Sequence, residues 1–131
     1  MSAILHLDKE TDANPNYREV LFTGARSQLV AMSIPPGTDV GEEVHPHVEQ
    51  TLYIHAGEGE AVLDGVRTPL KTGDVVVVTP GTRHDVVNTG STHLKIATVY
   101  APPNHIAGRI HKTKAEADAD DEDEAFGERV K

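Results

Sequence analysis

Two histidines separated by a single residue, His45 and His47, are the residues of this sequence best suited to chemistry. They lie in a segment, 43–47, that is predicted to be a strand, and the two-residue period of a strand places both imidazoles on one face. Imidazole nitrogens bind zinc, copper, iron and nickel, so one ion can take both side chains as ligands. Histidines that lie at the surface or form hydrogen bonds are the alternative interpretation of the pair.

Any further ligands must also be nitrogen or oxygen atoms, because the chain has no cysteine. Disulfides, thiolate zinc sites and cysteine nucleophiles are therefore excluded. A net charge of -9 at pH 7 argues against nucleic acids and anionic membranes as partners, since these bind basic surfaces. Residues 1–12 carry neither a basic region nor a long apolar run, so we expect a cytoplasmic protein.

The segments that must position these residues are short strands. Between residues 20 and 100 the apolar residues form short β-branched runs separated by glycine, proline and asparagine, a pattern typical of an antiparallel sandwich or barrel. Asp64-Gly65 predicts a tight hairpin, because such a pair supplies positive φ angles, and the proline pairs at 35–36 and 102–103 mark strand ends. The predicted strands are 19–23, 28–34, 43–47, 51–55, 60–63, 66–70, 75–78, 84–87 and 94–100.

With 131 residues the chain has room for one domain. We expect an N-terminal arm over 1–19, a barrel over 20–103 and a C-terminal extension over 104–131. Residues 115–128 of the extension are rich in carboxylates and alanine and poor in large apolar side chains. This composition predicts a solvated helix or a frayed tail, and we assign it no chemistry.

Two longer motifs contain the histidines. Residues 37–57 read glycine, His45-x-His47, an acidic or amide residue and, after six more residues, glycine. Residues 73–88 read Gly-x6-Pro-Gly-x2-His-x3-Asn and contain His84; Thr79 stands where the general motif has its proline, which is shifted to Pro80. These resemble the two signature motifs of the cupin superfamily, and the Tyr-Ala-Pro-Pro-Asn-His stretch, 100–105, resembles the small single-domain members. The resemblance covers roughly residues 20–100.

The resemblance implies an all-β double-stranded β-helix, the jelly-roll barrel of RmlC-like cupins, with a metal inside near one open end. It makes His84 the third imidazole and Gln50, counted back from the second glycine, the fourth ligand, where many cupins have glutamate. Glu49 is the alternative, because the spacing after His47 is shorter than in the general pattern. Gln50 shares strand parity with Leu52 and Ile54, which should face the interior.

Three neutral imidazoles and one neutral amide leave a divalent ion with its full charge of +2. Such a site should favour anionic ligands and act as a strong Lewis acid, with one or two coordination positions open as in catalytic sites. Zinc, nickel, iron, manganese, cobalt and copper all match this ligand set as the divalent transition metal.

Few other residues suit acid–base chemistry. Glu43 has the parity of the two histidines and would point into the barrel, although a solvated turn explains it equally well. Tyr53 and His55 have the opposite parity and should face outward or toward a partner subunit. Tyr100 and Arg83 are candidates for ligand contacts, with a rim aromatic and a surface arginine as the ordinary interpretations. The histidines without ordered spacing, predicted not to be ligands, are His6, His93, His105 and His111.

We therefore expect a metal-dependent enzyme that acts on a small polar or anionic molecule, as a dioxygenase, sugar-phosphate isomerase or cyclase. The glutamine argues against close kinship to the glutamate-bearing oxalate-type enzymes. A non-catalytic module that binds or senses a metabolite or a metal is the alternative, and likeness of fold does not decide between them. Cupins commonly pair, and an open barrel has edge strands to cover, so we also expect a homodimer.

Overall fold

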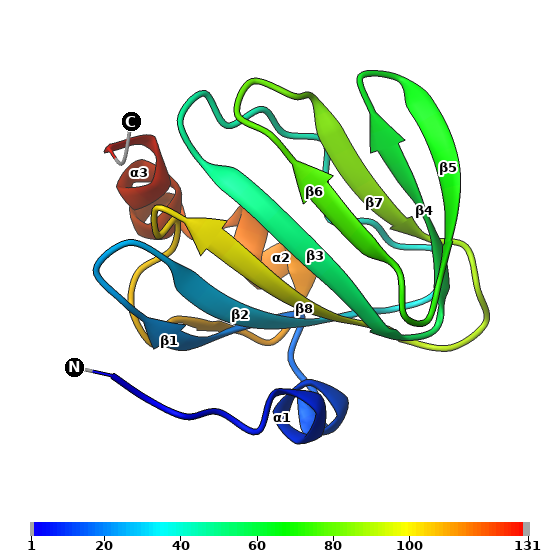
Figure 1. Cartoon of the computed structure of the whole chain (residues 1–131), viewed down its shortest axis with the longest axis horizontal. Helices are drawn as coiled ribbons and strands as arrows, with labels where there is room; N and C mark the ends of the chain where they lie inside the picture. Colours follow the sequence, from blue (N-terminus) through cyan, green and yellow to red (C-terminus); the bar gives the residue numbers. More distant parts are fainter. Residues whose placement is uncertain (1, 130–131) are drawn as a thin grey trace.

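The computed structural model describes residues 2–129 and consists mainly of antiparallel strands (Figure 1). The strands are β1 (Arg18–Thr23), β2 (Gln28–Ile34), β3 (Glu49–Ala56), β4 (Glu58–Leu63), β5 (Val66–Lys71), β6 (Val75–Val78), β7 (His84–Asn88), β8 (Leu94–Ala101) and β9 (Ile110–His111). The helices are α1 (Leu7–Ala13), α2 (Lys114–Asp118) and α3 (Asp121–Arg129). Among residues 2–129, none of the helices has the length and apolarity needed to cross a membrane.

The strands form two sheets that face each other, which agrees with the antiparallel sandwich or barrel predicted from the sequence pattern and with the jelly roll that the resemblance implies. One sheet has the order β6-β3-β8-β2-β1-β9 and the other the order β5-β4-β7. Alternate residues point inward: along β3, Gln50, Leu52 and Ile54 are buried and the residues between them are not. The core between the sheets is filled by branched and long apolar side chains, among them Val30, Met32, Ile34, Leu52, Ile54 and Ile96.

The hairpin predicted at Asp64-Gly65 is confirmed. β4 and β5 pair directly up to Leu63 and Val66, and the two loop residues have φ angles of 49° and 83°. Positive φ at both central positions is the requirement of a type I′ turn, which glycine and aspartate tolerate. The proline pairs also lie where expected, immediately after the ends of β2 and β8.

The strand predicted over residues 43–47 is wrong. This segment is an extended loop that joins the three-stranded sheet through a single bridge, between Glu43 and His84. Pro46 explains the difference, because it has no N–H to donate to a ladder. The loop crosses the open end of the barrel and turns at Pro46 and His47 before β3 begins.

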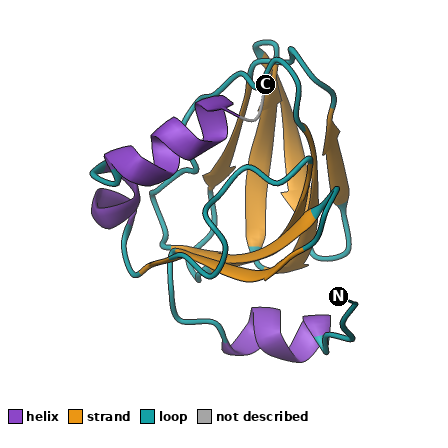
Figure 2. Ribbon diagram, turned by 90° about the vertical axis from the view of Figure 1, so that its left-hand side faces the viewer, coloured by secondary structure: helices purple, strands orange, loops and turns teal. Residues whose placement is uncertain are grey.

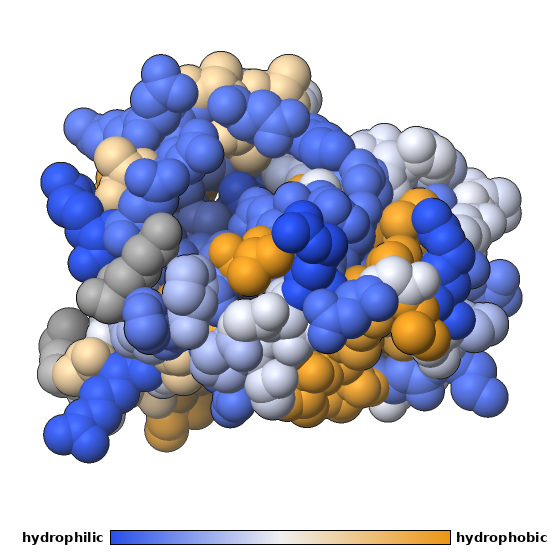
Figure 3. All heavy atoms as spheres, turned by 90° about the horizontal axis from the view of Figure 1, so that it is seen from above, coloured by the Kyte–Doolittle hydropathy of each residue, from blue (hydrophilic) through white to orange (hydrophobic). Residues whose placement is uncertain are grey.

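Both ends of the chain contain helices that pack on the barrel (Figure 2). α1 lies on the outer side of the six-stranded sheet, where His55 of β3 contacts Asp8 and Asp12. The acidic extension is not a frayed tail over the described residues: it folds as β9, α2 and α3, and Asp123 is buried. Seen from above, the surface is mainly hydrophilic, with its hydrophobic residues in small separate patches (Figure 3).

Local sequence explains where the C-terminal helices begin. The hydroxyl of Thr113 accepts a hydrogen bond from the backbone N–H of Glu116 at 3.2 Å, and Glu116 in turn accepts one from the N–H of Lys112. The carboxylate of Asp120 accepts a hydrogen bond from the N–H of Asp123 at 3.1 Å. Side-chain oxygens of this kind satisfy N–H groups that have no partner within a helix.

Candidate metal centre and adjoining cavity

His84 begins β7 and points into the barrel, where it is 4% exposed. Its Nδ1 lies 2.9 Å from the carbonyl oxygen of Thr82. A carbonyl only accepts, so Nδ1 carries the hydrogen and the lone pair of the neutral ring is on Nε2. Burial lowers the pKa of His84, although the hydrogen bond to Thr82 acts in the opposite direction. A neutral ring whose far nitrogen is fixed by a carbonyl is the usual arrangement of a metal-ligating histidine.

His45 lies opposite His84, with the two ring centroids 5.2 Å apart. Its Nε2 donates to a carboxylate oxygen of Glu43 at 2.9 Å, and its side chain is 16% exposed. Partial burial raises the pKa of Glu43, but the hydrogen bond from His45 and nearby positive charges outweigh it and hold that pKa below its ordinary value. Tyr100 completes this group of rings, 6.5 Å from His45. Burial raises the pKa of Tyr100 to about 12, so it is neutral at pH 7.

Gln50 is buried beside Tyr100, its register partner on β8, whereas Glu49 is exposed. The predicted strand parity of Gln50 is therefore confirmed. Its amide nitrogen donates to the hydroxyl of Thr98 at 3.1 Å, and its carbonyl oxygen accepts no hydrogen bond from any residue between 2 and 129. The free oxygen is the atom with which an amide binds a cation.

His47 does not lie with the other three residues. It is exposed at the turn that follows Pro46. Donor atoms of His45, His47 and His84 do not lie within 4.8 Å of one another: among residues 2–129 the only such group of histidine, aspartate or glutamate atoms is that of His111, Asp120 and Asp123. The structure thus places His45 beside His84 and buries Gln50 next to Tyr100, whereas His47 is exposed.

The group of His111, Asp120 and Asp123 is a structural junction. Asp120 accepts hydrogen bonds from His111 at 2.8 Å and from Arg109 at 2.9 Å, in addition to capping α3. These hydrogen bonds lower the pKa of Asp120 to about 2, with that from His111 as the largest cause. Both oxygens of each carboxylate already have protein donors, so we assign the group to holding α3 on the barrel.

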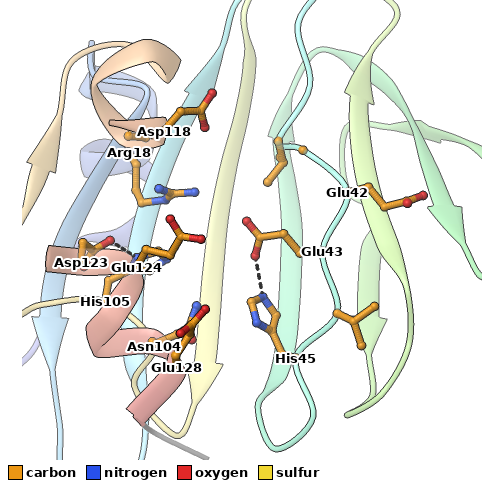
Figure 4. Close-up of a pocket in the computed structure, with 15 residues that line it drawn as sticks. Arg18, Glu42, Glu43, His45, Asn104, His105, Asp118, Asp123, Glu124 and Glu128 are labelled. Atoms are coloured by element: carbon orange, nitrogen blue, oxygen red, sulfur yellow. Dashed lines mark hydrogen bonds and ion pairs between the residues drawn. The ribbon is translucent and has the colours of Figure 1, made fainter. Parts of the chain in front are cut away.

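A cavity of about 520 Å³ adjoins His45 and opens between the 43–47 loop and α3 (Figure 4). Arg18 and His105 lie on one side of it, and Glu43 and His45 on the other. The volume is in the range of sites for small molecules. Exposed carboxylates line the cavity, those of Glu42, Glu43, Asp118, Glu124 and Glu128.

His105 is a cavity residue that the histidine spacing did not indicate. Its Nδ1 donates to Asp123 of α3 at 2.7 Å, and its Nε2 is buried without a partner among residues 2–129. Burial lowers the pKa of His105. Burial alone would raise the pKa of Asp123, but the hydrogen bonds from His105 and Ile106 outweigh it, so the pKa of Asp123 is also lowered. The sequence signal for His105 was the resemblance of residues 100–105 to small cupins. Its partner Asp123 lies 18 residues further along the chain, a spacing that matches no motif.

The remaining candidates have ordinary surroundings. Arg83 is at the surface and pairs with Glu42 at 3.2 Å. His55 faces outward onto α1, as its parity predicted, and His93 forms a hydrogen bond with Ser33 at 3.1 Å. His6 is the N-cap residue of α1, and its side chain forms no capping hydrogen bond with that helix.

The fold and the arrangement of these residues define a small single-domain jelly-roll barrel with imidazoles at one open end. A family model for the cupin domain matches residues 30–100, and the chain belongs to the cupin family. It is 34% identical to a crystallised protein of Bacillus halodurans, with a TM-score of 0.89 over 91% of this chain and 95% of that one.

Two curated relatives are also similar in sequence. The uncharacterized protein YrkC of Bacillus subtilis strain 168 is 38% identical over 120 residues, which cover 87% of this chain and 64% of that protein. This chain therefore spans less than two thirds of that relative. The oxalate-binding protein of Thermotoga maritima is 38% identical over 82 residues, 63% of this chain and 67% of that protein.

Proposed function

We propose that this cupin binds a divalent transition-metal ion through His45, Gln50 and His84, joined by His47, and acts on a small polar or anionic molecule in the adjoining cavity. The observation that carries the proposal is His84, whose Nδ1 is fixed by the carbonyl of Thr82 while its Nε2 is free beside His45. The free carbonyl oxygen of Gln50 adds a donor of the right kind.

His47 would have to turn inward to complete the set. The 43–47 segment is a loop with one bridge to the sheet, at Glu43, so a rotation at residues 46–47 breaks no ladder. Occupancy of the site supplies the free energy for such a change, because binding stabilises the conformation that coordinates.

When bound, the metal supplies Lewis acidity at its full charge of +2, since all four ligands are neutral. Zinc, nickel, iron, manganese, cobalt and copper remain the candidates. The protein's own groups then orient the substrate: Glu43 holds His45, and His105 offers an unprotonated Nε2 at the cavity. A histidine oriented by a carboxylate is a common proton acceptor in catalysis, which favours the enzyme among the candidate functions.

A binding or sensor module is the second candidate. The name of the Thermotoga maritima relative, an oxalate-binding protein, favours it. Oxygen consumption by the iron(II) form, screened against flavonols, diketones and thiols, distinguishes the two for dioxygenase chemistry. Turnover of any of these compounds would support the enzyme; isomerase assays on sugar phosphates are the next comparison.

The metal site is tested by replacing His84 or His47 with alanine and measuring zinc per chain by elemental analysis after reconstitution and dialysis. Each substitution removes a ligand, so we expect zinc to fall from about one per chain to background. His93→Ala is the matched control, because His93 is tied to Ser33 away from the site, and it should keep its zinc. Full retention of zinc in both ligand variants would refute the site as drawn.

A further inference from the structure

Arg18 is a charged residue at an inward-facing position of β1. It shares the face of Val20, which belongs to the core, and it is only 7% exposed. Its backbone is fixed on both sides, by Met32 of β2 and by His111 of β9. The guanidinium carbon lies 5.5 Å from the centre of the Tyr17 ring, so the side chain is also supported from one face.

Over the described residues 2–129, the guanidinium has no carboxylate partner. Among residues 2–129, no carboxylate oxygen lies within 4.0 Å of a nitrogen of Arg18, and its Nε is buried without a hydrogen bond. The carboxylate that faces it across the cavity, Glu43, is engaged by His45. Buried arginines are normally paired, since removing the charge from water without a partner is unfavourable.

The guanidinium, which has no carboxylate partner among residues 2–129, points into the cavity (Figure 4). Of the buried side-chain nitrogen and oxygen atoms that lack partners within residues 2–129, which number four, two belong to residues lining this cavity, Arg18 and His105. The planar fork of a guanidinium matches the two oxygens of a carboxylate. The cavity therefore contains a preformed position for one anionic group.

The lining of the cavity limits the kind of anion. The exposed carboxylates of the lining repel a ligand with more than one negative charge; they belong to Glu42, Glu43, Asp118, Glu124 and Glu128. A single carboxylate loses least to this repulsion and gains the charge-assisted hydrogen bonds from Arg18. A phosphate dianion fits the electrostatics less well.

We propose that Arg18 binds the carboxylate of a small monocarboxylic acid in the cavity between the 43–47 loop and α3. This inference names a substrate class for the proposed function. It rests on that function in one respect only, that the end of the ligand away from its carboxylate would approach the metal. Binding of the carboxylate at Arg18 does not itself require the metal.

The test measures binding of glycolate and acetate by calorimetry to the full chain, both metal-free and zinc-loaded, with phosphate as the dianionic comparison and chloride as the ionic-strength control. We expect both carboxylates to bind the metal-free protein, and phosphate to bind more weakly. Arg18→Met should weaken carboxylate binding about tenfold or more, because it removes the charged fork and keeps the aliphatic stem. Arg83→Met, which removes an exposed arginine paired with Glu42, should bind as the wild type does.

Two further measurements separate binding from folding and from the metal site. Arg18→Met should melt no lower than the wild type without ligand, since it removes an unpaired buried charge, and Arg18→Lys should keep the fold and bind with intermediate affinity. Zinc content should be unchanged in Arg18→Met, whereas His84→Ala should lose zinc and still bind glycolate. Failure of the wild type to bind either carboxylate, equal affinity in Arg18→Met, or a Tm lowered by several degrees in that variant would each overturn the inference.

Discussion

At the scale of single residues, the pairing of His105 with Asp123 determines where the extension meets the barrel. His105 follows β8, and Asp123 comes from α3, so one hydrogen bond of 2.7 Å joins two segments of different origin. The second oxygen of Asp123 accepts the N–H of Ile106 at 2.7 Å. His105 also contacts Tyr100 edge-on, with ring centroids 5.0 Å apart, which connects α3 to the interior near His45.

Asp123→Ala should therefore destabilise the protein by about 2 kcal/mol at pH 7, because it leaves a buried imidazole N–H and a backbone N–H without acceptors. Urea denaturation followed by circular dichroism measures the difference. Asp121→Ala is the control: Asp121 is an exposed acid in the same helix, and its loss should change stability by less than about 0.5 kcal/mol. Equal losses in the two variants would contradict the role of the pair.

The same scale shows what strand parity can and cannot predict. Parity correctly chose Gln50 over Glu49 as the inward residue, because both lie within a regular strand with a core of Leu52 and Ile54. It failed for His47, since alternation holds only where the ladder continues, and Pro46 ends it. The isolated arginine at Arg18 gave no signal, because nothing in its sequence neighbourhood shows that the strand buries it.

At the scale of elements, a pair of carboxyl groups joins β7, the loop before Gly41 and α2. Asp85 of β7 accepts a hydrogen bond from the backbone N–H of Gly41 at 3.0 Å, and Asp39 accepts one from the ammonium group of Lys114 at 2.5 Å. Burial and a hydrogen bond to Asp39 raise the pKa of Asp85 to about 7, while the hydrogen bond from Asp85 lowers that of Asp39. One proton is thus shared between the two groups near neutral pH.

A raised pKa means that the folded chain holds this proton more tightly than the unfolded chain does. Its contribution to stability is complete below the unfolded value of 3.8 and is lost as the pH rises through about 7. Asp85→Asn keeps the donor without titrating, so its stability relative to that of the wild type should increase by about 1 kcal/mol from pH 5.5 to pH 8. Thermal melts at both pH values measure this.

Glu58→Gln provides the control for the carboxyl pair, because Glu58 is an exposed acid at the start of β4. It should show the same pH profile as the wild type. A stability difference between the wild type and Asp85→Asn that is the same at pH 5.5 and pH 8 would contradict proton sharing.

The strands were largely predictable from the sequence, and so was helix in the acidic extension as one of two expected states, whereas α1 and the packing of the extension on the barrel were not. β-branched runs bounded by proline, and by the Asp64-Gly65 pair, mark segments whose alternate residues fill the core. α1 has only seven residues, of which Thr11 is buried. Because so short a helix is not stable alone, its stability comes from packing on the outer side of the six-stranded sheet. The acidic helices depend on partners far away in sequence, such as Arg109 and His105, that composition does not reveal.

At the scale of the whole molecule, the open edge of the larger sheet is apolar. β6 pairs only with β3, and its outward-facing residues, Val75 and Val77, are each 54% exposed. An exposed, short apolar edge strand is a surface on which a second sheet can add. We propose that the homodimer expected from the sequence forms along this edge.

Light scattering coupled to size-exclusion chromatography should give the mass of a dimer at micromolar concentration. Val75→Lys places a charge on the edge and should weaken the dimer about tenfold or more, so that a monomer elutes. Val66→Lys on β5, an exposed valine at the edge of the smaller sheet, is the matched control and should remain dimeric. A wild-type monomer over the whole concentration range would rule out this assembly.

The positions of the site residues along the chain have one further consequence. His45, His47, Gln50 and His84 all lie within the 30–100 segment that the cupin domain defines, whereas Arg18, His105 and Asp123 lie in the flanks before and after it. The matched segment thus carries the proposed metal ligands, and the flanking segments carry Arg18 and His105, which we propose to select what reaches them. Exchanging these flanks between cupin barrels should therefore change the proposed ligand selectivity and leave the proposed metal ligands in place.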